Sequence, residues 1–198
     1  WILDDDSSIR WVLQKALKTA DIASCCFENP HDLLLQLRSG QVPEVIISDV
    51  KMPQMDGLTL LNEVHSQYPE LPVIIMTAHS DLDSAVNAYQ SGAFEYLPKP
   101  FDISEAVGLT ERALAHVKEH PKVVEQPSTN SVSSEIIGAA PAMQEVFRAI
   151  GRLARSSISV LINGQSGTGK ELVAHALHKH SPRAKNPFIA LNMAAIPA

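Results

Sequence analysis

Residues 45–57 read V-I-I-S-D-V-K-M-P-Q-M-D-G, and the pattern around them recurs through the first part of the chain. The β-branched apolar run Val45–Ser48 predicts a buried strand, and Asp49 follows at its carboxyl end. A turn containing Pro and Gly comes next, and the amphipathic stretch Leu58–Gln67 predicts a helix. The stretch therefore predicts a strand, a loop that begins with a carboxylate, and a helix.

The same alternation of strand and helix extends in both directions from this stretch. Further strands are expected at Trp1–Leu3, Ala23–Phe27, Val73–Thr77 and Glu95–Leu97. Further helices are expected at Ser8–Ala20, His31–Ser39, Leu82–Ser91 and Ser104–His120. Five strands, each followed by a helix, predict an α/β fold in which a five-stranded parallel sheet is doubly wound, as in flavodoxin-like proteins.

A second unit is expected after the first 118 residues. Residues 119–133 are rich in Pro, Ser and other polar residues without periodicity, which is typical of a linker. Residues 134–198 predict helices at Met143–Ala154 and Leu172–His180, with strands at Ile158–Ile162 and Phe188–Asn192. These elements are too few to close a sheet. Since the sequence also opens with Trp1, already inside an apolar run, we expect the chain to be part of a longer protein.

Composition excludes several classes of protein. The chain has 198 residues, 45% hydrophobic and 19% charged, with a net charge of -6, so no basic surface for nucleic acid is indicated. No stretch is long and apolar enough to span a membrane, and no secretory signal opens the chain, so a cytoplasmic location is expected. The neighbouring Cys25 and Cys26 are interpreted as buried, reduced thiols.

Acidic and hydrogen-bonding side chains follow the predicted strands of the first unit. Asp4, Asp5 and Asp6 come after the first strand, Asp49 after the third, Thr77 at the end of the fourth and Lys99 after the fifth. Ligands of open parallel sheets bind at the carboxyl ends of the strands, so these side chains are expected to converge. Clustered carboxylates repel each other unless a cation joins them, and hard oxygen ligands at an open site suit Mg²⁺.

An acidic cluster taken alone is equally well explained as a group of solvated loop residues. The combined pattern is more specific: the acidic cluster, then S-D-V-K-M-P-Q-M-D-G at 48–57, M-T-A at 76–78 and Y-L-P-K-P-F at 96–101. In this combination the first 118 residues resemble the receiver domains of bacterial response regulators, in particular those of nitrogen regulators. The resemblance implies that Asp49 accepts a phosphoryl group.

The resemblance also implies roles for the residues around Asp49. Asp4 and Asp5 match the acidic pair of the family, with Asp5 the more direct ligand of Mg²⁺, and the backbone of Lys51 supplies a further ligand. Thr77 and Tyr96 match a pair of residues that respond to phosphorylation, and Lys99 matches the lysine of the site. The bond between Lys99 and Pro100 is usually cis in this family.

A glycine-rich loop lies between the predicted strand at 158–162 and the helix at 172–180. Its residues are Gly164, Gln165, Ser166, Gly167, Thr168, Gly169 and Lys170. Strand, loop and helix together favour a P-loop, whose backbone N–H groups cradle phosphates, over an ordinary glycine turn. Glu171 stands where P-loops usually carry the Ser or Thr that binds Mg²⁺.

The second unit resembles the sigma-54 activator branch of the AAA+ ATPases, in which a glutamate at this position is normal. The resemblance covers I-I-G-A-A-P-A-M-Q-E-V at 136–146, the loop and its flanks at 157–178, and N-P-F-I-A-L-N-M-A-A-I-P at 186–197. It implies ATP as cofactor and Gly164–Glu171 as the binding loop. The motifs needed for hydrolysis are absent from these residues, so we expect nucleotide binding without hydrolysis.

The two resemblances together favour a response regulator phosphorylated by a sensor histidine kinase that controls transcription of nitrogen-assimilation genes. Its further partners would be sigma-54 RNA polymerase, enhancer DNA and other copies of the protein. Two alternatives remain: a phosphoacceptor module that competes for the kinase without transcriptional output, and a freestanding P-loop ATPase. His175, His178 and His180 lie near the loop, but their spacing does not place all three on one helix face, so packing or solvated roles are favoured over a metal site.

Overall fold

The computed structural model describes residues 1–78, 82–119, 140–154 and 156–191. Five short strands form the sheet: β1 (Ile2–Leu3), β2 (Cys26–Phe27), β3 (Ile46–Asp49), β4 (Val73–Thr77) and β5 (Glu95–Pro98). Five helices alternate with them: α1 (Ser7–Thr19), α2 (Pro30–Arg38), α3 (Gly57–Gln67), α4 (Leu82–Gln90) and α5 (Ile103–Glu119). The predicted alternation is therefore confirmed, with boundaries that shift by a few residues.

The sheet is parallel throughout and has the strand order β2-β1-β3-β4-β5. This is the flavodoxin-like order, in which the chain reverses its direction of winding between β1 and β3. Loops that carry aspartates follow the carboxyl ends of these two neighbouring strands. The topology thus places the acidic residues of two distant segments at one edge of the sheet.

Alternating side chains of the central strands build a core on each face of the sheet. Ile47, Ile74 and Met76 pack with buried residues of α1 and α5, whereas Ile46 and Ile75 pack with buried residues of α2, α3 and α4. The period of two along each strand explains why neighbouring residues join opposite cores. All the strand residues of β3 and β4 are buried, as expected for a sheet covered on both faces.

Local capping fixes where the helices begin. Asp6 accepts a hydrogen bond from the backbone N–H of Ser8 at the start of α1, and Asp56 accepts one from Leu58 at the start of α3. Both carboxylates satisfy N–H groups that a helix leaves without partners in its first turn. The two acidic loops are therefore anchored to their helices by one of their own side chains.

The second unit contributes two described helices, α6 (Pro141–Leu153) and α7 (Lys170–Lys179). Residues 156–191 contain no strand, so the strands predicted at 158–162 and 188–192 are wrong for the part of the chain that the structure describes. A strand needs a neighbouring strand that completes its backbone hydrogen bonds, and the sequence pattern of one segment does not show whether such a neighbour is present. The apolar side chains of Ile158, Leu161 and Ile189 are correspondingly exposed. The predicted linker at 119–133 lies, apart from Glu119, outside the described residues, and the domain boundaries stay predictions.

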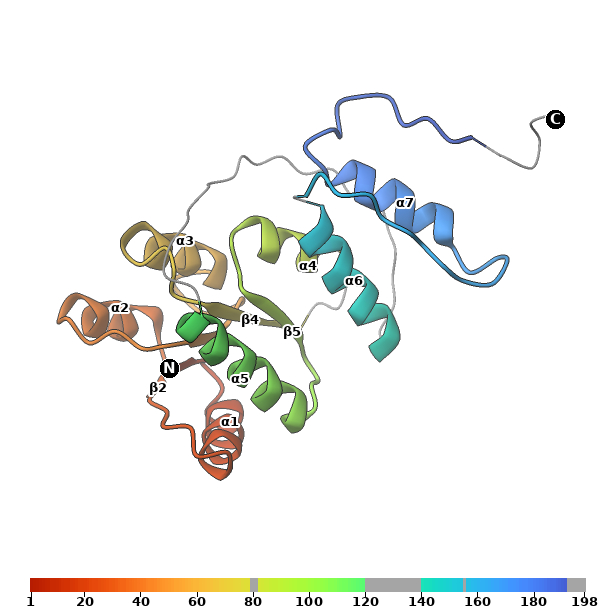
Figure 1. Cartoon of the computed structure of the whole chain (residues 1–198). Coiled ribbons are helices and arrows are strands. Elements are labelled where there is room, and N and C mark those ends of the chain that lie inside the picture. The colour runs from red at the N-terminus through yellow and green to blue at the C-terminus, as the bar shows by residue number, and fades with distance from the viewer. Residues whose placement is uncertain (79–81, 120–139, 155, 192–198) are drawn as a thin grey trace.

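Helix α6 packs beside α4, next to the edge strand β5, as Figure 1 shows. Phe147 and Ile150 of α6 are buried in the same core as α4. Gly151 lies directly against the ring of Tyr89, where a Cβ would come within 2.3 Å of Tyr89 Cδ2. The second unit therefore contacts the face of the first unit that α4 and β5 form.

One minor prediction failed in the first unit. Cys25 is exposed and Cys26 is half-buried, so neither thiol is fully buried as expected. The reason is that β2 is an edge strand that begins only at Cys26, which leaves Cys25 at its amino end in contact with solvent.

No helix among the described residues is long and apolar enough to cross a membrane.

Candidate functional site

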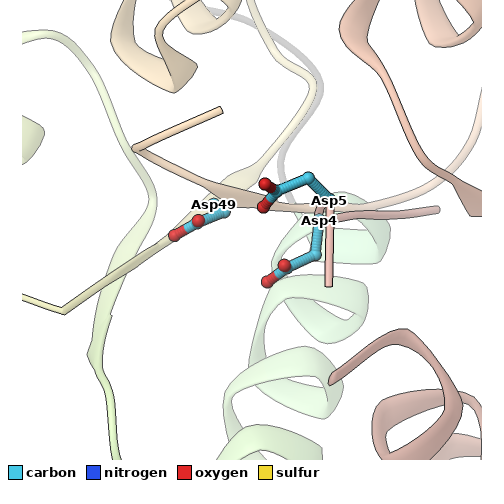
Figure 2. Close-up of side chains that lie close together, drawn as sticks. All are labelled: Asp4, Asp5 and Asp49. Carbon is cyan, nitrogen blue, oxygen red and sulfur yellow. The ribbon is translucent and has the colours of Figure 1, made fainter. Parts of the chain in front are cut away.

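Three carboxylates converge at the carboxyl ends of β1 and β3. Figure 2 shows Asp4 and Asp5, from the loop after β1, beside Asp49, the last residue of β3. One oxygen of each lies within 4.8 Å of the others. Asp4 is fully buried, Asp49 is nearly so, and Asp5 is exposed. The predicted convergence of these three residues is therefore observed, and their oxygens form a donor set of the kind that Mg²⁺ accepts.

Lys99 closes the site from the end of β5. Its ammonium group donates a hydrogen bond to Asp4 Oδ2 at 2.7 Å and lies 3.1 Å from Asp49 Oδ1. Burial alone would lower the pKa of Lys99, but the hydrogen bond and charge of Asp4, together with the charge of Asp49, raise it. Lys99 is therefore a permanent cation that balances one of the two buried carboxylates. The peptide bond between Lys99 and Pro100 is cis, as expected from the resemblance.

Burial raises the pKa of Asp49, and the negative charge of Asp4 adds to the effect, while Lys99 opposes both. A carboxylate whose pKa is raised in this way is more basic than an ordinary aspartate. Asp49 is the only carboxylate of the three that ends a strand of the sheet. The position of Asp49 is therefore fixed by the hydrogen-bonded pairing of β3 with β4 as well as by Lys99.

Backbone contacts hold the two acidic loops in place. The guanidinium of Arg10 donates to the carbonyl oxygens of Asp4 and Asp5 at 2.7 and 3.0 Å. In the other loop, Gly57 packs against the backbone of Asp49, and a Cβ at this position would lie 2.2 Å from the Asp49 carbonyl oxygen. Only glycine fits there. Sequence reasoning missed both Arg10 and Gly57, although the D-G pair at 56–57 was a visible signal.

The three aspartates at 4–6 have different roles in the structure. Asp4 and Asp5 contribute to the carboxylate group, whereas Asp6 caps α1 through Ser8. The backbone N–H of Ser8 holds the pKa of Asp6 below its ordinary value. The participation of Asp6, which the sequence left open, is therefore that of a helix cap.

The other residues predicted for this site lie around the same edge of the sheet. Thr77 ends β4 and is buried, Tyr96 in β5 is fully buried, and Lys51 is exposed in the loop after Asp49. Their proposed roles in phosphorylation rest on the resemblance of their motifs. Thr77 ends the strand next to β3, whereas Tyr96 lies inside β5, which is separated from β3 by β4.

The glycine-rich loop at 164–170 leads directly into α7. Gly169 is the N-cap and adopts a left-handed conformation with φ of 83°, as does Gly167 with φ of 82°. Glycine suits both positions because a side chain disfavours positive φ. Lys170 Nζ donates to the carbonyl oxygens of Gly164 and Gln165 at 2.8 and 2.6 Å. The loop therefore curls around the lysine that would face a phosphate.

The histidines near this loop form no group with metal-ligand geometry among the residues that the structure describes. The rings of His175 and His178 contact the ring of Phe188, with centroid distances of 4.1 and 5.3 Å. His180 points elsewhere, toward Asp83 of α4. The predicted packing roles are consistent with these contacts.

Two protein families match the chain. The response regulator receiver domain family matches residues 1–111, and the sigma-54 interaction domain family matches residues 136–198. The chain belongs to the response regulator receiver family. It continues into the start of a sigma-54 interaction domain, and the order of the two matches reproduces the order predicted from the motifs.

The curated relatives point to one group within this receiver family. The chain is 64% identical to the DNA-binding transcriptional regulator NtrC of Salmonella typhimurium over 199 residues, and 64% identical to that of Escherichia coli K12 over 200 residues. All of the chain is covered, but it spans only 42% of the length of each relative. The chain is therefore a homologue of the N-terminal region of NtrC, a sigma-54 activator with a receiver domain.

Solved structures support the same relationship. The apo receiver domain of nitrogen regulatory protein C is 60% identical over 60% of this chain and 95% of that one, with a TM-score of 0.54. NtrX of Brucella abortus in complex with ATP is 30% identical over 99% of this chain and 43% of that one, with a TM-score of 0.56. The receiver fold and the continuation into a second unit are thus both represented among known structures.

A polar network between the receiver and α6 was missed by sequence reasoning. The carboxylate of Glu95, buried at the start of β5, accepts a hydrogen bond from the Tyr89 hydroxyl at 2.8 Å and pairs with Arg152 of α6. Glu105 of α5 pairs with Arg148 of α6. Burial raises the pKa of Tyr89, and the neighbouring Glu95 raises it further. Glu95 lies in a predicted strand of the buried sheet, and a buried charge normally has a partner. This acid was therefore the sequence signal for the network.

Proposed function

We propose that the chain is the phosphorylation-controlled front part of a sigma-54 transcription activator and that Asp49 is its phosphoacceptor. The supporting observation is the arrangement of Asp49 beside Asp4, Asp5 and Lys99 at the switch point of the sheet. The proposed donor is a sensor histidine kinase in the cytoplasm. The proposed target genes are those of nitrogen assimilation, because relatives that match the whole chain at 64% identity are NtrC proteins of other bacteria.

The chemistry proposed for Asp49 is nucleophilic. A carboxylate oxygen of Asp49 attacks the phosphorus of the donor, and the bond from phosphorus to the donor nitrogen breaks in line, giving an acyl phosphate. Mg²⁺, held by Asp4, Asp5, Asp49 and the backbone of Lys51, would supply positive charge for the phosphoryl oxygens. Lys99 is already within ion-pair distance of Asp49 and offsets the negative charge that the phosphoryl group adds.

Phosphorylation is proposed to act by shifting populations of two receiver conformations. Thr77 would hydrogen-bond to the new phosphoryl group, Tyr96 would adjust with it, and α4 would move or reorder. The contacts of Tyr89 with Glu95 and Gly151 would transmit that movement to α6. The activator would then assemble on enhancer DNA and engage sigma-54 RNA polymerase through other parts of the protein.

The second unit is proposed to bind ATP. The proposed phosphate cradle runs from Gly164 to Lys170, with the N-terminus of α7 favouring negative charge. Glu171 takes the position of the usual hydroxyl residue, so the metal that accompanies the nucleotide would need another ligand. No step of hydrolysis is proposed for these residues.

Phosphorylation can be tested by mass spectrometry after incubation with acetyl phosphate and Mg²⁺. We expect the chain to gain one phosphoryl group, and Asp49→Asn to gain none. Asp21→Asn is a matched control because Asp21 is exposed and has φ of 56°, a conformation that Asn tolerates equally well. Equal labelling of Asp49→Asn and the wild type would rule out Asp49 as the acceptor.

A second experiment separates the proposed function from the alternatives. Transcription from a sigma-54 promoter is measured in the source organism under nitrogen limitation, with the chromosomal gene carrying Asp49→Asn. Loss of induced transcription supports an activator. Normal induction together with normal phosphorylation of the wild type would instead support a phosphoacceptor module without transcriptional output.

A further inference from the structure

One asparagine of the chain is followed by glycine, and it stands directly before the glycine-rich loop. Asn163 precedes Gly164, and no other Asn-Gly pair occurs in the 198 residues. Both residues are exposed and lie in irregular backbone, outside any helix or strand. An asparagine in this setting is open to a reaction with its own main chain.

The reaction joins the side chain of an asparagine to the peptide nitrogen that follows it. The Gly164 nitrogen would attack Cγ of Asn163, and its proton would pass to the side-chain nitrogen, which leaves as ammonia. A succinimide ring remains. Water then adds to one of the two ring carbonyls and opens the ring to aspartate or isoaspartate, so that water is the only reactant consumed.

The backbone around Asn163 leaves the attacking nitrogen accessible. The Gly164 N–H and the Asn163 side chain form no hydrogen bond among the residues that the structure describes. Glycine places no side chain beside the attacking nitrogen and permits the backbone rotation that ring closure requires. Neither a hydrogen bond nor a bulky neighbour therefore opposes the approach of this nitrogen to Cγ.

A positive charge lies close to Gly164. Lys170 Nζ donates a hydrogen bond to the Gly164 carbonyl oxygen at 2.8 Å. The attacking form of the Gly164 nitrogen is anionic, and a nearby cation favours an anionic form. The lysine of the loop therefore assists the step that begins the reaction.

The other asparagines that the structure describes each lack one of these conditions. Asn62 and Asn87 are also exposed, but they lie inside α3 and α4, where the next N–H group donates to a helix carbonyl. Asn29 and Asn186 precede prolines, which have no N–H to attack with. Exposure therefore does not distinguish Asn163, whereas its irregular backbone and the glycine after it do.

We propose that Asn163 is a site of spontaneous deamidation and that the product weakens nucleotide binding by the glycine-rich loop. The second half of this inference rests on the proposed binding of ATP. Aspartate or isoaspartate at 163 places a negative charge beside residues 164–170, whose expected ligand is itself negative. Isoaspartate also adds a methylene group to the main chain before Gly164, which displaces the N–H groups that would cradle the phosphates.

The rate is measured by incubating the 198-residue chain at pH 8 and 37 °C and mapping its peptides by mass spectrometry at intervals. The mass of each asparagine-containing peptide reports replacement of the amide nitrogen by oxygen, and enzymatic methylation counts isoaspartate. Asn62 and Asn87 are controls within the same molecule. Asn163 is expected to react at least about tenfold faster than either, a difference of ~1.4 kcal/mol in activation free energy. Equal rates at the three asparagines would overturn the proposed site.

Asn163→Gln tests the mechanism, because its longer side chain would have to close a larger and less favourable ring. The peptide that contains residue 163 should then lose its amide about as slowly as those of Asn62 and Asn87. Loss at the wild-type rate from Asn163→Gln would show that the Gly164 nitrogen is not the attacking group.

The effect on the loop is measured as affinity for fluorescently labelled ADP. Asn163→Asp carries the charge of the product, and Asn163→Gln is its matched neutral control. Asn163→Asp is expected to bind ADP roughly threefold or more weakly than Asn163→Gln, because its carboxylate repels the phosphates. The wild type should lose affinity as its deamidated fraction rises, whereas Asn163→Gln should keep its affinity over the same incubation.

The results separate the two halves of the inference from the proposed function. Equal affinities of Asn163→Asp and Asn163→Gln, with unchanged affinity of the deamidated wild type, would overturn the effect on binding and leave the modification site intact. Failure of the fresh wild type to bind ADP would instead overturn the proposed nucleotide site, and the peptide map would still decide whether Asn163 deamidates.

Discussion

Replacing Lys99 by Met should destabilise the receiver in the absence of divalent cations, and Mg²⁺ should restore much of the loss. Lys99 Nζ lies 2.7 Å from Asp4 Oδ2 and 3.1 Å from Asp49 Oδ1, and both carboxylates are buried. Met keeps the length and apolar stem of the side chain but removes its charge. The variant therefore leaves two carboxylates close together without a cation, which is the costly way to break a buried ion pair.

The magnitude follows from the distance between the carboxylates. Oxygens of Asp4 and Asp49 lie within 4.8 Å of each other, and two unit charges at that distance repel by about 3 kcal/mol at an effective dielectric constant of about 20. The destabilisation has an upper limit, because one of the two carboxylates can take up a proton instead. Protonating an aspartate of ordinary pKa at pH 7 costs about 4 kcal/mol. We therefore expect Lys99→Met to lower the free energy of unfolding by about 3 kcal/mol.

Urea unfolding followed by tryptophan fluorescence measures this effect, because both tryptophans, Trp1 and Trp11, lie in the receiver. The control is Lys18→Met, which removes an exposed lysine from the end of α1 and should change stability by less than about 0.5 kcal/mol. With excess Mg²⁺ in place of EDTA, Lys99→Met should gain more stability than the wild type. Equal stability of the two variants in EDTA, or an equal gain with Mg²⁺, would refute the electrostatic account of the site.

Substitutions at three positions test other features of the structure. Gly151→Val should separate α6 from α4, because a Cβ at this position would lie 2.3 Å from Cδ2 of Tyr89; hydrogen exchange in both helices should become faster, and unchanged exchange would contradict the packing. Asp6→Ala should lower the free energy of unfolding by about 1 kcal/mol in urea through loss of the hydrogen bond from Ser8, whereas Asp6→Ser should lose less. Burial raises the pKa of Asp49, so the native state binds its proton more tightly than the unfolded state does, and this group lowers stability as pH rises through its folded pKa. The free energy of unfolding of Asp49→Asn relative to the wild type should therefore increase between pH 4 and pH 7, and a pH-independent difference would argue against the raised pKa.

The sequence determined the fold of the receiver and predicted that Asp4, Asp5, Asp49 and Lys99 come together. Short apolar runs and amphipathic stretches are local patterns, and five of each in alternation leave few topologies. Once the sheet is parallel, residues that follow different strands, such as Asp5 and Asp49, must meet at one edge. The glycine-rich loop was equally readable, because its conformation depends on Gly167 and Gly169 within a short segment.

Tertiary structure decided how similar residues divide their roles. Three consecutive aspartates look alike in the sequence, but Asp4 pairs with Lys99, which follows β5, whereas Asp5 stays exposed and Asp6 caps α1. The division depends on where the chain turns after β1 and on a lysine 95 residues away. Sequence periodicity carries no information about such a long-range partner.

The contacts between the receiver and the second unit likewise came only from the structure. Glu95 and Arg152 meet because α6 packs beside α4 and β5, and Asp83 meets His180 because α7 ends there. The strands expected at 158–162 and 188–192 failed for the same reason, since a strand exists only where a neighbouring chain completes its hydrogen bonds. A local sequence pattern indicates which secondary structure a segment can form. Which other segment it packs against, and which charge it pairs with, depends on the tertiary structure.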